Sequence, residues 1–417
     1  MDIGIIADDL TSATDAGIQF ARVGYTAEIQ FNNPEAPVID PDVLSIDIDS
    51  RRQCGLEAGA AAKRASTRIK TARIVFKTVD STLRGHIGIE LAAVLQGTGR
   101  RRAIMAPAFP SARRITRDGM QFLHGRPVHE TEFKHDPLNP VENSCIASLL
   151  TNSGISPVAN LGRPQVLYPQ LIRAALVSAQ CIVADAETDE DLQTIVRAVG
   201  EVADICWAGS PGLARALGEV YPAAKRTAPE VHACRGVLVV VGSLNAVSRQ
   251  QLAHLLVSDT GICLDADDLS AQRTADATDY VVRLARLRLG QRKPVVLFSR
   301  DCNIATNTPA RLADSARATA DAFAEIARRL IHEGVVDGLV VTGGDTATEV
   351  LRRLDATGIR LERELEAGIP IGRITGPHPV RIITKAGGFG RENTLARACE
   401  VLFDGSASVE SSNGESI

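Results

Sequence analysis

The sequence predicts an α/β protein with two domains, each built on a mostly parallel sheet with flanking helices. Short apolar runs such as Ile3–Ala7 alternate along the chain with helix-like segments such as the alanine-rich stretch 56–69. That alternation is typical of βαβ units. The stretch 221–233 carries proline, alanine and mixed charge without a clear period, which indicates a linker. We therefore expect one domain at residues 1–225 and a second at 234–417.

The composition excludes several classes of protein. Of 417 residues, 45% are hydrophobic but only 4% aromatic, so the core must be aliphatic. A formal charge of −4 does not suggest a nucleic-acid partner. None of the eight cysteines forms a Cys-x-x-Cys pair, which disfavours a zinc ribbon. No apolar run approaches the roughly 20 residues that span a bilayer, and no signal peptide precedes the first strand, so we expect a cytoplasmic protein without membrane contact.

The first domain contains a series of strand-like runs, most of which lead into polar turns or helix-like segments. They are Ile3–Ala7, Ala27–Phe31, Val43–Asp47, 73–76, 103–108, Val158–Leu161, 180–184 and 204–208. Because ligands of open α/β sheets bind at the carboxyl ends of the strands, the residues that follow these runs are the candidates for function.

The first strand ends in two adjacent carboxylates, Asp8 and Asp9. They could hold substrate hydroxyls or a magnesium ion. Alternatively, they could cap the following helix and complement its dipole. The strand Val43–Asp47 likewise leads to a polar turn, which contains Arg51. An arginine there could grip a carboxylate with two parallel hydrogen bonds.

The segment Lys77-Thr78-Val79-Asp80-Ser81-Thr82-Leu83-Arg84-Gly85 lies between a strand-like run and a helical pattern. We expect it to form a turn at the carboxyl end of a parallel strand. Its charged and hydroxyl side chains would suit a small polyhydroxy anion; they are Lys77, Asp80, Ser81, Thr82 and Arg84. The alternative is a helix start capped by Ser81 or Thr82.

Residues 118–145 are rich in glycine and proline, and we expect them to form loops. His124, His129 and His135 fall in this stretch at spacings of five and six residues. Those spacings match no zinc-binding template. We therefore interpret the three histidines as loop residues without a metal.

The second domain has glycine turns after three strand-like runs. The runs 236–241, Gly338–Thr342 and 382–385 lead to Gly242-Ser243, Gly343-Gly344-Asp345-Thr346 and Ala386-Gly387-Gly388, respectively. Glycines at strand–helix junctions allow a ligand to approach the backbone, and a helix N-terminus attracts phosphate. Thr342 and Lys385 end two of the runs. Asp345 could act as a general base, hold magnesium or cap its helix.

Two common nucleotide fingerprints are missing, since the chain has no Gly-x-x-x-x-Gly-Lys-Ser/Thr loop and no Gly-x-Gly-x-x-Gly after the first strand. A polar mixed-charge pocket in one domain and glycine turns in the other nevertheless predict a small-molecule kinase with its active site in the interdomain cleft. Phosphoryl transfer needs mainly positioning, magnesium and charge stabilisation.

Seven motifs, in this order, resemble the four-carbon acid sugar kinases, a group once catalogued as a domain of unknown function. They are Ala7-Asp8-Asp9-Leu10-Thr11, the segment from Lys77 to Gly85, Ala106-Pro107-Ala108-Phe109-Pro110, Asp136-Pro137-Leu138-Asn139-Pro140, Gly242-Ser243, Thr342-Gly343-Gly344-Asp345-Thr346-Ala347 and Lys385-Ala386-Gly387-Gly388-Phe389-Gly390. The resemblance covers nearly the whole chain.

The resemblance implies a sugar-acid-binding N-terminal domain and an ATP-binding C-terminal domain, with D-threonate or D-erythronate as substrate and ATP with Mg²⁺ as cofactors. The residues implied or predicted to bind the acid are Asp8, Asp9, Arg51, Lys77, Asp80, Ser81, Thr82 and Arg84. Those for ATP are Ser243, Thr342, Gly343, Gly344, Asp345, Thr346, Lys385, Gly387 and Gly388. We expect Asp345 to be the catalytic base, with Asp9 or Asp8 as the alternative. The product implied is phosphorylated at the 4-hydroxyl.

This chain departs from the family pattern at two places beside the acid site. Arg113-Arg114 stands where the family usually has Gly-Arg, and His86 stands where it tends to have asparagine. Both departures bear on the identity of the substrate more than on the activity.

Other functions stay open at this stage. The alternatives are a kinase of another hydroxy acid, such as 3-oxo-tetronate or glycerate, and a sugar-acid sensor without catalysis. A dehydrogenase is disfavoured by the missing dinucleotide fingerprint. A homodimer is an open expectation.

Overall fold

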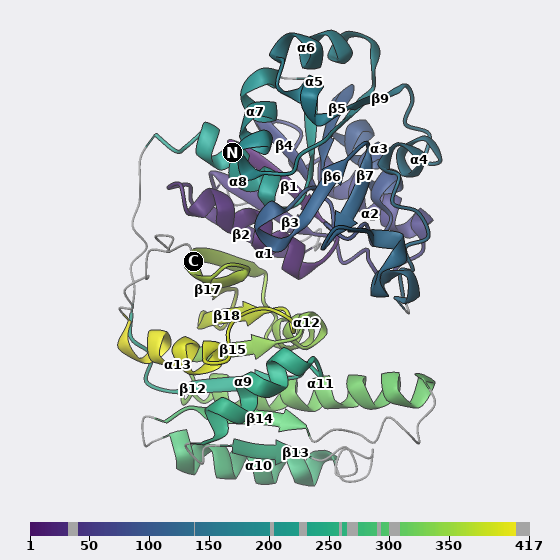
Figure 1. The fold of residues 1–417 in the computed structure, drawn as a ribbon. Coiled ribbons are helices and arrows are strands. Elements are labelled where there is room, and N and C mark those ends of the chain that lie inside the picture. Colours follow the sequence, from purple (N-terminus) through teal and green to yellow (C-terminus); the bar gives the residue numbers. More distant parts are fainter. Residues whose placement is uncertain are drawn as a thin grey trace, which may run out of the picture. The chain divides into compact units, whose positions relative to one another are not determined.

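The computed structural model describes residues 1–31, 41–136, 138–200, 204–224, 232–257, 261–264, 274–289, 293–299 and 309–405. The chain divides into two compact units, Met1–Ala228 and Pro229–Ile417 (Figure 1). Each unit is an α/β layer structure with a mostly parallel sheet, so the predicted fold class is confirmed.

The first unit is built on a parallel sheet with the strand order β2-β3-β1-β4-β11-β5-β10-β9. The strands are β1 Ile3–Ala7, β2 Ala27–Phe31, β3 Val43–Asp47, β4 Ile74–Thr78, β5 Arg102–Ala106, β9 Val158–Leu161, β10 Cys181–Ala184 and β11 Ile205–Gly209. Every residue of β1, β3, β4 and β11 is buried, as expected for parallel strands that are covered on both faces.

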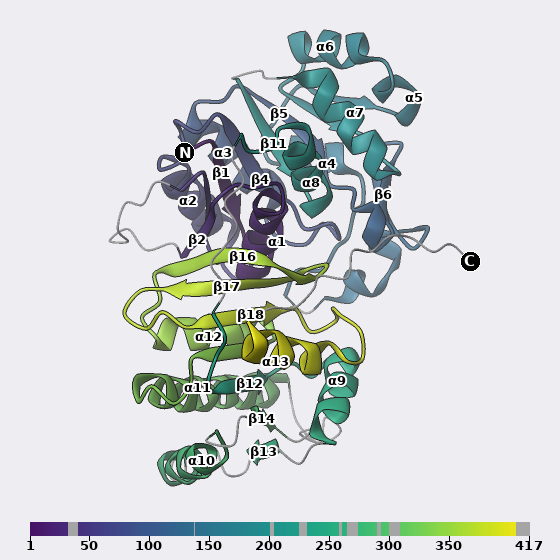
Figure 2. The same ribbon diagram turned by 90° about the vertical axis from the view of Figure 1, so that its left-hand side faces the viewer.

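Helices cover both faces of this sheet. They are α1 Leu10–Ala21, α2 Gly55–Ser66, α3 Ile87–Thr98, α4 Ile146–Thr151, α5 Arg163–Val166, α6 Pro169–Ser178, α7 Asp189–Val199 and α8 Pro211–Val220. Helix α8 packs between α1 and α7, whereas α2, α3 and α4 pack together with one continuous apolar cluster (Figure 2). The chain therefore alternates strand and helix as the sequence predicts.

The stretch predicted as loops is partly a small antiparallel sheet. It consists of β6 Arg114–Arg117, β7 Met120–Leu123 and β8 Arg126–Pro127. Short 3₁₀ turns follow at Val128–Glu130 and Glu132–His135. Strand β6 lies before the stretch 118–145, so the loop prediction was wrong for β7 and β8. Residues at positive φ, among them Gly119 and Gly125, form tight turns between the strands rather than ending regular structure.

The second unit has a sheet with the order β13-β14-β12-β15-β18-β17-β16, in which, among the described strands, β17 alone runs opposite to the others. Its strands are β12 Val237–Val241, β13 Gly261–Leu264, β14 Val295–Ser299, β15 Gly338–Thr342, β16 Gly358–Glu366, β17 Ile369–Thr375 and β18 Arg381–Lys385. The β16–β17 hairpin has no counterpart in the sequence prediction.

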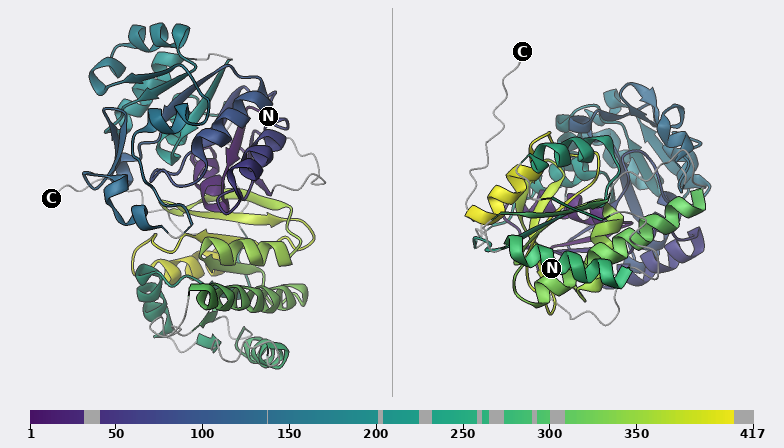
Figure 3. Two further views of the ribbon diagram at one scale, coloured as in Figure 1. Left: turned by 90° about the vertical axis from the view of Figure 1, so that its right-hand side faces the viewer. Right: turned by 90° about the horizontal axis from the view of Figure 1, so that it is seen from below.

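The helices in the described part of the second unit lie on the two faces of its sheet. They are α9 Ala246–Leu256, α10 Thr274–Leu289, α11 Pro309–His332, α12 Gly344–Arg353 and α13 Thr394–Asp404. Helix α13 packs beside α9 on one face, and α10, α11 and α12 follow one another on the other (Figure 3). Among the described residues, no helix combines the length and apolar character needed to cross a bilayer.

Candidate active site

The polar turns of the first unit meet at a point where the chain changes direction across the sheet. Strand β1 lies between β3 and β4. From β1 the chain proceeds to β2 and β3 on one side, and from β4 it proceeds to β5 on the other. Such a switch point leaves room for a ligand at the carboxyl ends of the strands. Asp8 follows β1, Arg51 follows β3 and Asp80 follows β4, so the three turns converge there.

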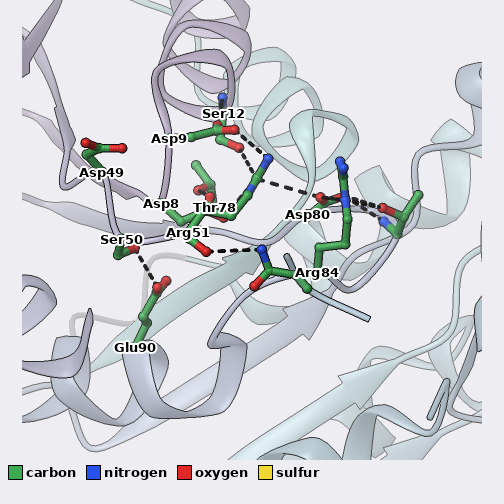
Figure 4. A network of polar contacts seen from close by, with 12 residues as sticks. Asp8, Asp9, Ser12, Asp49, Ser50, Arg51, Thr78, Asp80, Arg84 and Glu90 are labelled. Carbon is green, nitrogen blue, oxygen red and sulfur yellow. Dashed lines mark hydrogen bonds and ion pairs between the residues drawn. The ribbon is translucent and has the colours of Figure 1, made fainter. Parts of the chain in front are cut away.

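Arg51 is the centre of this acid-site cluster (Figure 4). Its Nε donates to Asp8 Oδ2 at 2.9 Å, and its NH1 lies 2.5 Å from Asp9 Oδ2. Its NH2 donates to Ser12 Oγ at 3.2 Å and lies 3.7 Å from Asp80 Oδ2. One guanidinium thus joins carboxylates from the turns after β1 and β4.

The turn after β4 is held by its own side chains. Asp80 Oδ1 accepts from the backbone N–H and the hydroxyl of Thr82, both at 2.8 Å. Arg84 Nε donates to Asp80 Oδ2 at 2.7 Å. Helix α3 begins only at Ile87, after His86. The alternative in which Ser81 or Thr82 caps the helix is therefore wrong.

Asp9 has two roles at once. Its Oδ1 accepts from the backbone N–H of Ser12 at 2.7 Å, so it caps α1. Its Oδ2 pairs with Arg51. The capping and site interpretations of Asp9 are thus compatible, because the two oxygens of one carboxylate serve different partners.

Burial and charge push the two adjacent carboxyls in opposite directions. Burial raises the pKa of Asp8, but Arg51 and Lys77 outweigh it and lower the pKa to about 2. Burial also raises the pKa of Asp9, where Arg51 opposes it incompletely and the charge of Asp8 adds to it. Burial raises the pKa of Asp80 as well, but Arg51 and Arg84 bring it below its usual value. Asp9 is therefore the most basic of these three carboxylates.

Lys77 lies within β4 and not on the turn, which corrects the sequence-based placement. Its Nζ lies 2.8 Å from Glu90 Oε2 and donates to the backbone carbonyl of Thr78 at 2.6 Å. Ser50 Oγ donates to the other oxygen of Glu90 at 2.6 Å. The buried ion pair thus fastens the residue before Arg51 to α3. A direct substrate contact by Lys77 stays a prediction.

Sequence reasoning missed three contributors from the segment 133–139. Asp136 Oδ2 lies 3.6 Å from Arg84 NH1, and the ring of Phe133 lies 5.0 Å from the Arg84 guanidinium carbon. Asn139 Nδ2 donates to the backbone carbonyl of Arg51 at 3.1 Å. The motif containing Asp136 and Asn139 was the available signal, but its sequence distance from the other turns gave no reason to place it beside them.

The two departures from the family pattern have clear positions. Arg113 has φ of 56°, a left-handed conformation in which glycine is unstrained. His86 Nε2 lies 2.7 Å from the backbone carbonyl of Gln53, which ties the start of α3 to the loop after β3.

Of the three histidines that the sequence places in loops, His129 contacts Ser144 Oγ at 2.8 Å through its Nδ1. Among the described residues, no group of His, Cys, Asp or Glu is arranged as a metal site.

The glycine turns of the second unit also converge, at the switch point between β12 and β15. A Cβ on Gly387 would lie 2.2 Å from Ser243 Oγ, and a Cβ on Gly242 would lie 1.9 Å from Thr346 Oγ1. Gly343 has φ of 99°, and a Cβ on it would lie 3.4 Å from the backbone nitrogen of Ser243. The turns after β12, β15 and β18 therefore form one backbone cradle, as phosphate-binding turns do. Asp345 lies exposed in the first turn of α12.

Lys385 stabilises the loop after β18, which is one of the three turns of this cradle. Its buried ammonium donates to the backbone carbonyls of Ala386, Gly387 and Phe389 at 3.0, 3.2 and 3.1 Å, and to Ser248 Oγ at 3.1 Å. Burial lowers the pKa of Lys385 to about 8, against the effect of Glu366. The ammonium of Lys385 is thus directed at the loop, whereas phosphate contact by Lys385 stays a prediction.

Comparison with known proteins decides the family. A model described as a sugar-binding N-terminal domain matches residues 3–217, and one described as a nucleotide-binding C-terminal domain matches residues 238–395. A Bordetella bronchiseptica protein named D-threonate kinase is 33% identical, covering 96% of this chain and 97% of its own length. The chain belongs to the four-carbon acid sugar kinases. Like its relatives it is a kinase, a phosphotransferase acting on a sugar acid.

Other four-carbon acid sugar kinases and one solved structure extend the comparison. A Heliobacterium modesticaldum protein named D-erythronate kinase is 30% identical over 96% of this chain and 97% of its own. A solved Salmonella typhimurium protein titled a putative tRNA synthase superposes with a TM-score of 0.83 at 21% identity, over 95% of this chain and 98% of that one. At that identity, the structural match shows the fold alone.

Proposed function

We propose that the chain transfers the γ-phosphate of ATP to the terminal 4-hydroxyl of D-threonate or D-erythronate. The observation that carries the proposal is the acid-site cluster, in which Arg51 joins Asp8, Asp9 and Asp80 at a sheet switch point. Mixed cations and carboxylates match a substrate that has both a carboxylate and several hydroxyls. Relatives named for these two acids support the choice.

In this proposal residues 1–225 hold the acid and residues 234–417 hold the nucleotide. The carboxylates of Asp8 and Asp80 accept hydrogen bonds from the substrate hydroxyls, and the hydroxyls of Ser81 and Thr82 exchange further hydrogen bonds with the substrate. The arginines attract the anion. Ser243 and the glycine turns at 343–344 and 387–388 offer backbone N–H groups to the phosphates.

The residues of the cradle fit a nucleotide with magnesium. Mg²⁺ in kinases is held by one or two carboxylates together with phosphate oxygens and water, and Asp345 is the carboxylate at the start of α12. Bound Mg²⁺ would supply charge neutralisation at the phosphate oxygens. We propose Asp345 as the catalytic base, with Asp9 as the alternative. Asp9 has support from its raised pKa.

The test is a coupled ADP-release assay over a panel of D-threonate, D-erythronate, 3-oxo-tetronate and glycerate, with ATP and magnesium. We expect turnover with D-threonate or D-erythronate and little with glycerate. Absence of turnover on every acid by folded protein would contradict the proposal, and acid binding without ATP binding would favour a sensor. A homodimer and a cytoplasmic location stay predictions.

A further inference from the structure

In the acid site, two arginines face four carboxylates. Arg51 pairs with Asp8 and Asp9 and approaches Asp80. Arg84 pairs with Asp80 and approaches Asp136. The substrate carboxylate would bring a further negative charge next to these groups, and both arginines are already engaged. Like charges at such short separations repel one another unless another cation compensates them.

The ammonium of Lys77 does not meet this need, because its ion pair with Glu90 is almost fully buried beneath the cluster. Arg114 differs from these cations. Among the ion pairs of the described residues, none involves Arg114. Its NH1 donates to the backbone carbonyl of Ala112 at 3.2 Å, but its Nε is buried and has no hydrogen-bond partner. A buried donor without an acceptor is costly, so this guanidinium is ready to gain from an incoming anion.

The strand that carries Arg114 is fastened to the turn after β4. Arg114 and Thr116 lie two residues apart in β6 and therefore on the same face. Thr116 pairs with Gln121 of β7, and its hydroxyl donates to Gln121 Oε1 at 2.7 Å. Gln121 Nε2 in turn donates to the backbone carbonyl of Ser81 at 2.8 Å. The face of the hairpin that bears Arg114 is thus bonded to the acid-site turn.

The charges around Arg114 agree with this placement. Burial lowers the pKa of its guanidinium, the charges of Asp80 and Glu132 oppose that effect, and the charge of Arg84 adds to it. Arg113, its neighbour, is exposed.

We propose that Arg114 binds the carboxylate of the sugar acid and thereby makes the enzyme prefer acids over neutral polyols. The inference rests on the proposed function for the identity of the substrate. A guanidinium can take a carboxylate with two parallel hydrogen bonds, and the Arg114 guanidinium is not committed to any carboxylate of the described residues. Arg51 and Arg84 then remain with the aspartates that read the hydroxyls.

The experiment compares R114Q with R113Q, a matched loss of one positive charge at the exposed neighbouring position. Position 113 has a left-handed backbone with φ of 56°, and glutamine is strained there to the same degree as arginine, so R113Q changes the charge alone. Steady-state kinetics use D-threonate and D-erythronate, with threitol and erythritol as the neutral counterparts. Calorimetric titration of the two acids without ATP gives binding independently of turnover. The fluorescence of Trp207, which is the one tryptophan of the chain and is buried in β11, checks that each variant is folded.

We expect R114Q to raise KM and the calorimetric Kd for the acid by roughly 10- to 100-fold, as for a lost charge-assisted contact. The KM for ATP and the slow turnover of the polyols should stay within about twofold, because the polyols have no carboxylate. R114K should recover part of the acid affinity, and R113Q should match the wild type.

An R114Q variant that is folded and binds the acids as tightly as the wild type overturns the inference while leaving the proposed function intact. So does an equal loss toward acids and polyols. If the wild type binds the acids through Arg114 but never phosphorylates them, the proposed function fails and the inference stands. If the wild type binds neither acid, both are overturned.

Discussion

The ammonium of Lys77 lies 2.8 Å from Glu90 Oε2, with both side chains almost completely buried. Glu90 also accepts from Ser50 Oγ, the hydroxyl next to Arg51 in the chain. Through Glu90, the ion pair therefore fixes the position of the loop that carries Arg51. Because each charge compensates the other where water is excluded, removal of one alone leaves an uncompensated buried charge.

We predict that K77M or E90L lowers the free energy of unfolding of the first unit by about 3–5 kcal/mol, as for other broken buried pairs. The double variant K77M/E90L should lose less than the sum, because it leaves no buried charge. Denaturant unfolding followed by Trp207 fluorescence measures this, since Trp207 belongs to the first unit. Additive losses in the double variant would show that the pair is not coupled.

The lowered pKa of Asp8 predicts a dependence of stability on pH. Its pKa falls from 3.8 to about 2 in the folded protein, so the folded state binds the proton less readily than the unfolded state. The contribution is present above about pH 4 and is lost as the pH falls toward 2, amounting to about 2 kcal/mol. Asp80, also lowered, acts in the same direction.

The D8N variant should show a weaker loss of stability between pH 4 and pH 2 than the wild type. Trp207 fluorescence in denaturant at each pH measures the difference. An identical pH profile in D8N would mean that Asp8 is not stabilised as a carboxylate by Arg51.

The sequence predicts the positions of Asp8, Asp80 and the turn at Gly343 at the edge of a sheet. Each of them follows a buried strand, and the carboxyl ends of parallel strands lie at one edge. Lys77 was misplaced because an apolar strand with one polar residue gives no sign that the charge is buried and paired. Position alone could not distinguish it from Arg84.

The missed hairpins combine a local signal with long-range contacts. Asp118-Gly119, with both residues at positive φ, is a two-residue turn between β6 and β7 that the sequence itself offers. The bond from Gln121 to the distant Ser81 and the pairing of β17 with β18 have no local signal, because they are set by tertiary packing.

The glycine cradle gives a matched pair of substitutions. A Cβ at Gly387 would lie 2.2 Å from Ser243 Oγ and 3.0 Å from Asn245 Cβ, whereas one at Gly388 would meet Asn245 Nδ2 only at 3.7 Å. We predict that G387A weakens ATP binding at least tenfold by displacing the turn after β12. G388A should leave the unliganded second unit as stable as the wild type.

Calorimetric titration with ATP and thermal unfolding measure these two effects. If G387A binds ATP as tightly as the wild type, the turns after β12 and β18 do not form one nucleotide site. A destabilised G388A would instead mean that the loop packs more tightly than the contacts of Gly388 indicate.

The choice of catalytic base can be tested with D345N and D9N. If Asp345 is the base, D345N should lower kcat by roughly 10²- to 10⁴-fold. D9N should mainly raise KM for the acid, because it disturbs the pair with Arg51. The pH profile of kcat measured for both variants assigns the role. A near-normal kcat in D345N with a large loss in D9N would transfer the role to Asp9.

The most direct test of the central claim is proton-coupled ³¹P NMR of the product formed from ATP and D-threonate or D-erythronate. Transfer to the terminal 4-hydroxyl places phosphorus next to a CH₂ group, so we predict a phosphomonoester signal split by two protons into a triplet, absent with R51A. A doublet, which signals phosphate on a secondary hydroxyl, or a signal from inorganic phosphate alone would contradict the account.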